Sequence, residues 1–77
     1  MDRSLVEDRL AWAEQRITSG DRSLARQRSV VDALIQSRHD TTRATDLLRV
    51  FERTQAQCLA ERDRLRSELM KGTDRFA

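Results

Sequence analysis

The chain has 77 residues, of which 38% are hydrophobic and 36% are charged, with a formal net charge of +2. This length limits the chain to one small domain, and the lack of proline together with only two glycines favours long helices. The single cysteine excludes an internal disulfide and a multi-cysteine zinc site. The sequence has neither a long apolar run nor a signal-peptide core, so we expect a cytoplasmic protein that does not enter the membrane.

The first predicted helix runs from about residue 4 to residue 37. Ser4 and Glu7 have the spacing of a capping box, and Asp2 is the alternative cap. Positions spaced four and three residues apart form one stripe on this helix: Val6, Leu10, Ala13, Ile17, Gly20, Leu24, Gln27, Val31 and Leu34. The spacing continues through Gly20 without a change of phase. We therefore predict one helix, weakened at Gly20 by about 1 kcal/mol relative to alanine.

The predicted turn occupies residues 38–40. Asp40 or Thr41 can cap the second helix, which should extend from about residue 41 to residue 71. Its stripe consists of Ala44, Leu48, Phe51, Gln55, Cys58, Arg62, Leu65 and Leu69. Gly72 predicts the end of this helix, followed by a frayed tail over residues 72–77. A connection this short joins antiparallel neighbours.

Together these elements predict an all-α fold, in which residues 1–77 form a single domain. Its two long antiparallel helices should pack as a coiled-coil-like helical hairpin. Counting outward from the turn places Gly20 near Cys58 and Leu59. Two glutamines, Gln27 and Gln55, lie on the stripes themselves, where a polar residue lowers stability but can fix the register of the helices.

Six apolar residues lie beside the stripes, where a two-helix hairpin cannot bury them. They are Leu5, Trp12, Val30, Ile35, Leu47 and Leu59. Exposed apolar patches usually mark an interface, and a second copy of the chain is the simplest cover. We therefore expect a homodimer that forms a four-helix bundle, with these six residues at the interface and Trp12 as its main binding residue. Loop-to-loop and loop-to-tail arrangements both stay open.

Four arginines of the first helix form a local excess of positive charge and a candidate anion-binding group: Arg16, Arg22, Arg26 and Arg28. Guanidinium groups suit phosphate, so a small nucleic-acid-associated protein is an alternative function. Acidic residues interleave the basic ones, however, and three aromatic residues are too few to stack bases. Solvated helix faces are the favoured interpretation of these arginines.

No arrangement of residues in the sequence indicates catalysis, because it lacks a paired-carboxylate motif, a glycine-rich phosphate loop and a nucleophile beside a base. We predict no enzyme activity, no cofactor and no metal site. His39 is followed by Asp40, as the phospho-accepting histidine of two-component kinases is followed by an acid. Those kinases place the histidine inside a helix, so a phosphotransfer accessory centred on His39 is the weakest alternative. Cys58 is expected to act as a small hydrophobic residue.

The strings Arg26-Gln27-Arg28 and His39-Asp40-Thr41 resemble a group of short uncharacterised helical proteins of rhizobia and related alphaproteobacteria. The resemblance continues through the apolar positions Ala44, Leu47, Leu48, Phe51 and Leu65. It implies the same helical fold and a bacterial, cytoplasmic setting, while the group has no established activity. Members of the group carry a glycine where this chain has Arg38. If Arg38 is left-handed, its side chain costs about 1 kcal/mol.

The function that these observations favour is that of a non-enzymatic helical-hairpin interaction or assembly protein. Such a protein should homo-oligomerise and present a surface to a protein partner. The apolar surface that one hairpin cannot cover is the basis of this prediction.

Overall fold

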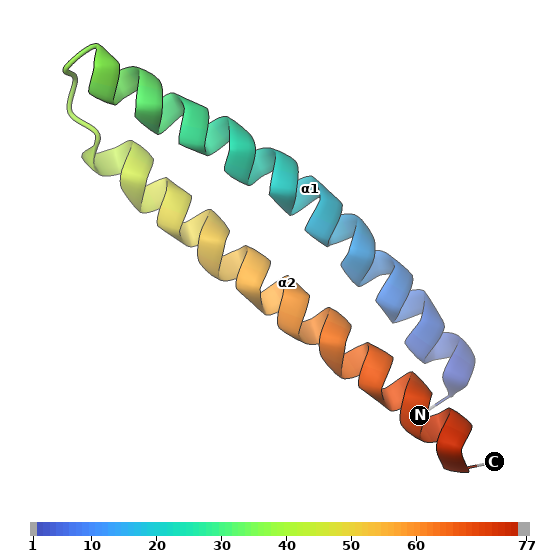
Figure 1. Cartoon of the computed structure of the whole chain (residues 1–77). Helices are drawn as coiled ribbons and strands as arrows, with labels where there is room; N and C mark the ends of the chain where they lie inside the picture. The colour runs from blue at the N-terminus through green and yellow to red at the C-terminus, as the bar shows by residue number, and fades with distance from the viewer. Residues whose placement is uncertain (1, 76–77) are drawn as a thin grey trace.

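The computed structural model describes the backbone of residues 2–75 and the side chains of residues 2–71. Helix α1 spans Arg3–Gln36 and helix α2 spans Thr42–Arg75. The two helices run side by side, with both termini at one end of the molecule and the turn at the other (Figure 1). The predicted all-α helical hairpin is therefore confirmed, and the described residues contain no strand.

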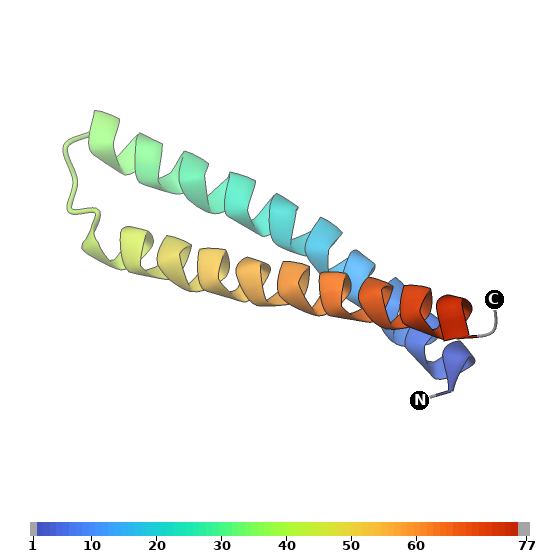
Figure 2. The same cartoon turned by 60° about the horizontal axis from the view of Figure 1, so that its bottom comes forward.

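The hairpin is long and thin, with principal extents of 60 × 15 × 14 Å (Figure 2). Its Cα radius of gyration is 17.5 Å, whereas a compact domain of this length has about 11.5 Å. Two helices share only one contact surface, so few side chains can be shielded from water on all sides. Among the described residues, those that are buried are Val6, Ala13, Leu24, Gln55, Cys58 and Leu65.

Asp2 caps the first turn of α1. Its Oδ1 atom accepts a hydrogen bond from the Ser4 amide at 3.1 Å. The predicted Ser4 capping box is wrong, because Glu7 instead accepts a hydrogen bond from Arg3 Nε at 2.9 Å. The extended backbone of Asp2 places its carboxylate over the free amides of the first turn, and α1 begins one residue earlier than predicted, at Arg3.

Helix α2 continues past Gly72 to Arg75, so the predicted end near residue 71 is wrong. A glycine ends a helix where it adopts a left-handed conformation, and no glycine among the described residues has a positive φ. The predicted frayed tail is thus helical over residues 72–75. Residues 76–77 lie outside the described part of the chain.

The turn occupies residues 37–41, which is longer than the predicted 38–40, and it begins with a Schellman motif. The Arg38 amide donates to the Ile35 carbonyl at 3.1 Å, and the His39 amide donates to the Leu34 carbonyl at 2.9 Å. This motif needs one left-handed residue, and Arg38 supplies it with a φ of 60°. Because arginine carries a β-carbon, this conformation costs about 1 kcal/mol.

The Asp40 side chain accepts hydrogen bonds at the start of α2. This helix begins at Thr42, one residue later than predicted. The Asp40 Oδ1 atom accepts hydrogen bonds from the Thr42 hydroxyl at 2.7 Å and from the Thr42 amide at 2.9 Å. Both bonds favour the ionised form, so they lower the pKa of the Asp40 carboxyl, and the bond from the hydroxyl has the larger effect. A charged carboxylate at this position also complements the positive end of the helix dipole.

Two glutamines connect the helices. Near the turn, Gln27 Nε2 donates to the Ala44 carbonyl at 2.8 Å. Near the middle, Gln55 Nε2 donates to the Ile17 carbonyl and to Asp21 Oδ1, each at 2.8 Å. Each bond joins one defined position of α1 to one defined position of α2. Sliding one helix along the other would leave these polar groups unpaired, so the glutamines fix the register.

Gly20 supplies the space that the Gln55 side chain occupies. A β-carbon at Gly20 would lie 2.7 Å from Gln55 Cδ and would collide with Oε1 of the same side chain. Gly20 and Cys58 line the same groove, as expected if they lie near each other. Gln55 nevertheless reaches Gly20, because a glutamine side chain extends along the partner helix by nearly the rise of one turn.

Replacing Arg38 with glycine should raise the free energy of unfolding by about 1 kcal/mol, because glycine adopts a left-handed conformation without a β-carbon clash. Urea unfolding at one fixed protein concentration, followed by circular dichroism, measures this change. The control Arg38→Ala keeps the β-carbon and should leave stability nearly unchanged. An equal gain in both variants would contradict the backbone explanation.

Replacing Gly20 with alanine should change stability in opposite directions in two backgrounds. In the natural chain the new β-carbon displaces Gln55 from its hydrogen bonds, and we expect a loss of about 1–2 kcal/mol. In a Gln55→Ala background the space is free, so alanine should add about 1 kcal/mol of helix propensity. Four urea unfolding curves complete the double-mutant cycle, and additive effects would refute the steric coupling.

Candidate interaction surface

Most of the six apolar residues predicted to lie at an interface are exposed in the hairpin. The exposed ones are Leu5, Trp12, Val30, Ile35 and Leu47, with Trp12 at 64%. Leu59 is half-buried. Sequence reasoning missed two further exposed apolar residues, Val50 and Met70. Val50 comes one residue before a stripe position, as Leu5 and Trp12 do, so the same heptad reasoning would have found it. Met70 comes one residue after a stripe position.

Three exposed residues of α1 lie on the same side of that helix. Val30 follows Trp12 by 18 residues, which is five turns of 3.6 residues. Leu5 precedes Trp12 by seven residues, which is close to two turns. The three side chains therefore form one line along α1.

Leu47 and Val50 of α2 are also exposed. They lie on the side of α2 that is next to the line formed by the three α1 residues. Val50 precedes Glu61 by 11 residues, which is close to three turns, and Leu47 lies one turn before Val50. Glu61 and Trp12 line one groove between the helices, so both lines belong to one face of the hairpin. We call this surface the Trp12 face and define it by Leu5, Trp12, Val30, Leu47 and Val50.

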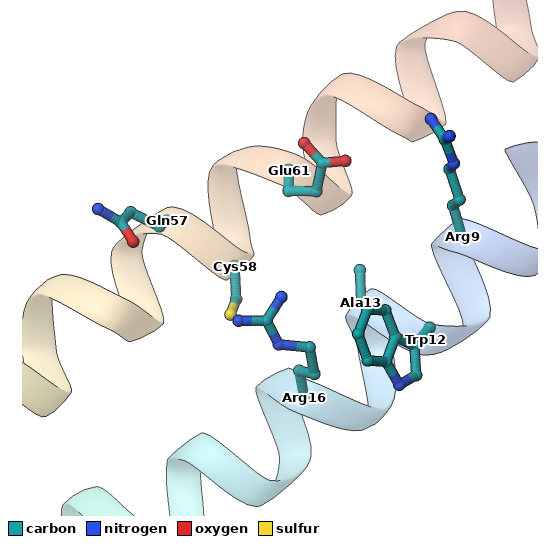
Figure 3. A pocket seen from close by; sticks show the side chains of 7 residues that line it. All are labelled: Arg9, Trp12, Ala13, Arg16, Gln57, Cys58 and Glu61. Carbon is teal, nitrogen blue, oxygen red and sulfur yellow. The ribbon is translucent and has the colours of Figure 1, made fainter.

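A groove of about 390 Å³ lies between the helices beside Trp12. Its lining residues are Arg9, Trp12, Ala13, Arg16, Gln57, Cys58 and Glu61 (Figure 3). The Arg16 guanidinium carbon lies 5.4 Å from the centre of the Trp12 ring, which is the distance of a cation–π interaction. Arg16 extends from α1 in the direction of Cys58 on α2 (Figure 3). One wall of the groove is therefore an indole flanked by a guanidinium group.

A second groove adjoins the first and also lies between the helices. Trp12 and Cys58 line both of them. The floor and sides of the second groove include the small residues Ser19, Gly20, Ser23, Thr54 and Cys58. We call these five residues the central hollow. Longer side chains, among them Gln15, Phe51 and Gln55, line the same groove, so the central hollow is only part of its surface.

Glu61 is the acidic group of the first groove. Arg64 Nη2 donates hydrogen bonds to its two carboxylate oxygens at 2.7 and 2.6 Å. The hydrogen bonds from Arg64 lower the pKa of the Glu61 carboxyl, and the positive charges of Arg9 and Arg16 lower the pKa further. The groove therefore holds a carboxylate between guanidinium groups, and its net electrostatic character is mixed.

The other exposed apolar residues lie on the opposite face. There Arg66 Nη2 of α2 pairs with Glu14 Oε1 of α1 at 3.6 Å. Leu59 precedes Arg66 by one heptad, and Ile35 follows Glu14 by three heptads, so both lie on this side. Met70 lies one turn beyond Arg66. The six predicted interface residues are thus divided between two faces, because residues that flank a stripe fall on either side of it.

The four candidate anion-binding arginines do not form one cluster. All four are exposed. Arg16 lies against Trp12, while Arg22 and Arg26 are one turn apart. Arg28 is two residues beyond Arg26, which is a rotation of about 200°, so it lies on the other side of α1. This dispersion does not favour the nucleic-acid alternative, which needs basic groups on one face.

His39 lies in the exposed turn, where its Nδ1 atom is 2.7 Å from Ser37 Oγ. Cys58 is a buried free thiol. Among the described side chains, no three histidine, cysteine, aspartate or glutamate residues come together as potential ligands of a metal ion. His39 therefore takes part in the local structure of the turn, and the Trp12 face remains the most distinctive surface of the described chain.

No known protein family, curated protein or solved structure matches this chain. Neither of the two helices, over the residues that the structure describes, has an apolar stretch long enough to cross a membrane. The surface geometry is therefore the basis on which a function can be proposed.

Replacing Arg64 with glutamine should raise the pKa of Glu61 toward its ordinary value of 4.5. A depressed pKa in the folded state means that ionised Glu61 stabilises the fold above its unfolded pKa, and that this stabilisation is lost as the pH falls through the folded pKa. The variant should therefore show a weaker dependence of stability on pH in acid.

Titration of the Glu61 carboxyl by nuclear magnetic resonance measures this shift. The matched control is Arg62→Gln, because the Arg62 guanidinium donates to Asp63 Oδ1 rather than to Glu61. We expect this control to leave the pKa of Glu61 unchanged. A Glu61 pKa that stays the same in Arg64→Gln would show that the Arg64 hydrogen bonds are not its cause.

Proposed function

We propose that this protein is a non-enzymatic assembly protein, in which two helical hairpins associate through the Trp12 face as a four-helix bundle. The bundle then presents its remaining surface to a protein partner. The observation that carries this proposal is the exposure of five large apolar side chains on one face: Leu5, Trp12, Val30, Leu47 and Val50. Several large apolar side chains exposed on one face of a protein in water are typical of an interface.

The surface area of the hairpin supports the proposal. The chain exposes 6141 Å², whereas a compact monomer of 9.0 kDa exposes about 4,850 Å². The excess of about 1,300 Å² exceeds the roughly 800 Å² that each partner buries in a standard protein interface. Covering one face of the hairpin would therefore bring its exposed area per chain close to that of an ordinary globular protein.

Trp12 has the properties of an interface anchor. Its side chain combines a large apolar area with few rotatable bonds, so burying it costs little conformational entropy. Arg16 already lies over the indole, and both tryptophan and arginine are enriched at protein interfaces. The two adjoining grooves give a facing helix places to insert its side chains.

The opposite face stays accessible in this arrangement, and we assign the protein partner to it. Ile35, Leu59 and Met70 are spread along its length rather than gathered in one patch. The Arg66–Glu14 ion pair lies between them. Scattered apolar residues among charges fit the smaller and more polar interface of a transient partner better than a permanent dimer core.

We expect the purified chain to sediment as a dimer and Trp12→Ala to weaken association by at least about 30-fold, which corresponds to about 2 kcal/mol for an interface tryptophan. Sedimentation equilibrium at several concentrations measures the dissociation constant. In the natural chain, tryptophan emission should also shift to shorter wavelength as concentration rises, since Trp12 is the only tryptophan.

The matched control is Ile35→Ala, which truncates a side chain of similar exposure on the opposite face and should leave the dissociation constant unchanged. A folded monomer at about 100 µM would refute self-association. A monomer that binds duplex DNA with a steep dependence on salt would favour the nucleic-acid alternative instead.

A further inference from the structure

We infer that the second copy binds antiparallel on the Trp12 face, so that the turn of one hairpin lies beside the termini of the other. The twofold axis of this dimer passes through the central hollow. The inference rests on the proposed self-association and adds its geometry, which the sequence left open.

The Trp12 face has three parts along its length. Val30, Leu47 and Val50 form an apolar patch at the turn end, which we call the turn patch. At 1.5 Å per residue, the turn patch lies about 13–18 Å from the midpoint of the helices. On the other side of the midpoint, Trp12 lies at about 11 Å and Leu5 at about 21 Å. The central hollow lies between these two apolar regions, at and just beyond the midpoint.

These positions are complementary under an antiparallel twofold rotation. The rotation brings the turn patch of one copy to the level between Trp12 and Leu5 of the other, and the same contact is made twice. Branched aliphatic side chains then meet one large ring and one leucine at both ends of the interface. In the middle, the part of each central hollow that lies on the axis, at the level of Ser19 and Gly20, faces its own copy, where small side chains take up little space between the hairpins.

A parallel pair fits this surface less well. It would place two Trp12 rings at one level and two central hollows at the next level, so the bulky pair would hold the hairpins apart beside the hollow and leave it unfilled. Voids of this kind lose packing energy because their lining atoms have no partners. A parallel pair would also put the two Arg9 side chains at the same level, whereas the antiparallel pair separates them by about 30 Å.

The surface area agrees with a dimer that uses the whole face rather than one end of it. The excess exposure of about 1,300 Å² per chain is larger than a contact at Trp12 alone could cover. An antiparallel overlap along the 60 Å hairpin covers both apolar regions of each copy. It also closes the assembly, because an isologous interface uses the same patch on both chains and leaves no second copy of it exposed.

Distances between spin labels, measured by double electron–electron resonance, test the geometry. Labels would be attached to Gln36→Cys at the turn end and to Asp8→Cys near the termini, each in a Cys58→Ala background. Both labelled sites are exposed. In the antiparallel dimer the two copies of residue 36 should be about 50 Å apart, and the two copies of residue 8 about 35 Å apart. A parallel dimer would bring both pairs within about 25 Å.

Circular dichroism and sedimentation of each labelled variant establish that it is folded and dimeric before the distances are interpreted. Two long distances support the antiparallel dimer. Two short distances overturn it and leave the proposed self-association intact. A monomer without a dipolar signal overturns both proposals, and a species larger than a dimer overturns the closed twofold arrangement.

Discussion

Gln55 lies in the space left by the absent side chain of Gly20, and this contact decides how the two helices align. Its amide donates across the hairpin to the Ile17 carbonyl and to Asp21, each at 2.8 Å. A buried amide without partners would cost about 1–3 kcal/mol, so alignments that break these bonds are disfavoured. Once the alignment is fixed, so are the residues that border each groove. The Trp12 face therefore exists as one surface because a polar side chain near the middle of the hairpin determines which levels of α1 and α2 meet.

The thinness of the molecule is the second physical constraint. Two helices can shield only the side chains between them, and the hairpin is only about 15 Å across in its two short directions. Apolar residues that flank the contact remain in water, and the hydrophobic effect favours any arrangement that removes them from it. Leu65 is fully buried between the helices, while Trp12 is 64% exposed beside them. The same stripes that hold the hairpin together thus leave a surface whose burial requires another chain.

The turn shows how local chemistry sets the direction of the chain. Arg38 adopts a left-handed conformation with a φ of 60° because the Schellman hydrogen bonds at the end of α1 require it. Two residues later, Asp40 accepts both hydrogen bonds from Thr42 that begin α2. The conformational cost at Arg38 is therefore offset by paired backbone groups on both sides of it. The result is a reversal of the chain within residues 37–41 that keeps the helices adjacent.

The sequence by itself determined the two helices, their antiparallel order and most of the exposed apolar residues, because periodicity depends only on the local geometry of a helix. It also singled out Gln27, Gln55 and Gly20 as unusual members of the stripes. It misplaced the end of α2, because a glycine ends a helix only where it adopts a left-handed conformation, and Gly72 continues the helix instead. Only the tertiary structure decided that Gln55 reaches Gly20, that Trp12 and Glu61 share a groove, and that Ile35 and Leu59 lie on the other face. These facts depend on contacts between residues more than 30 positions apart, and a local pattern does not encode how far a side chain reaches along a neighbouring helix.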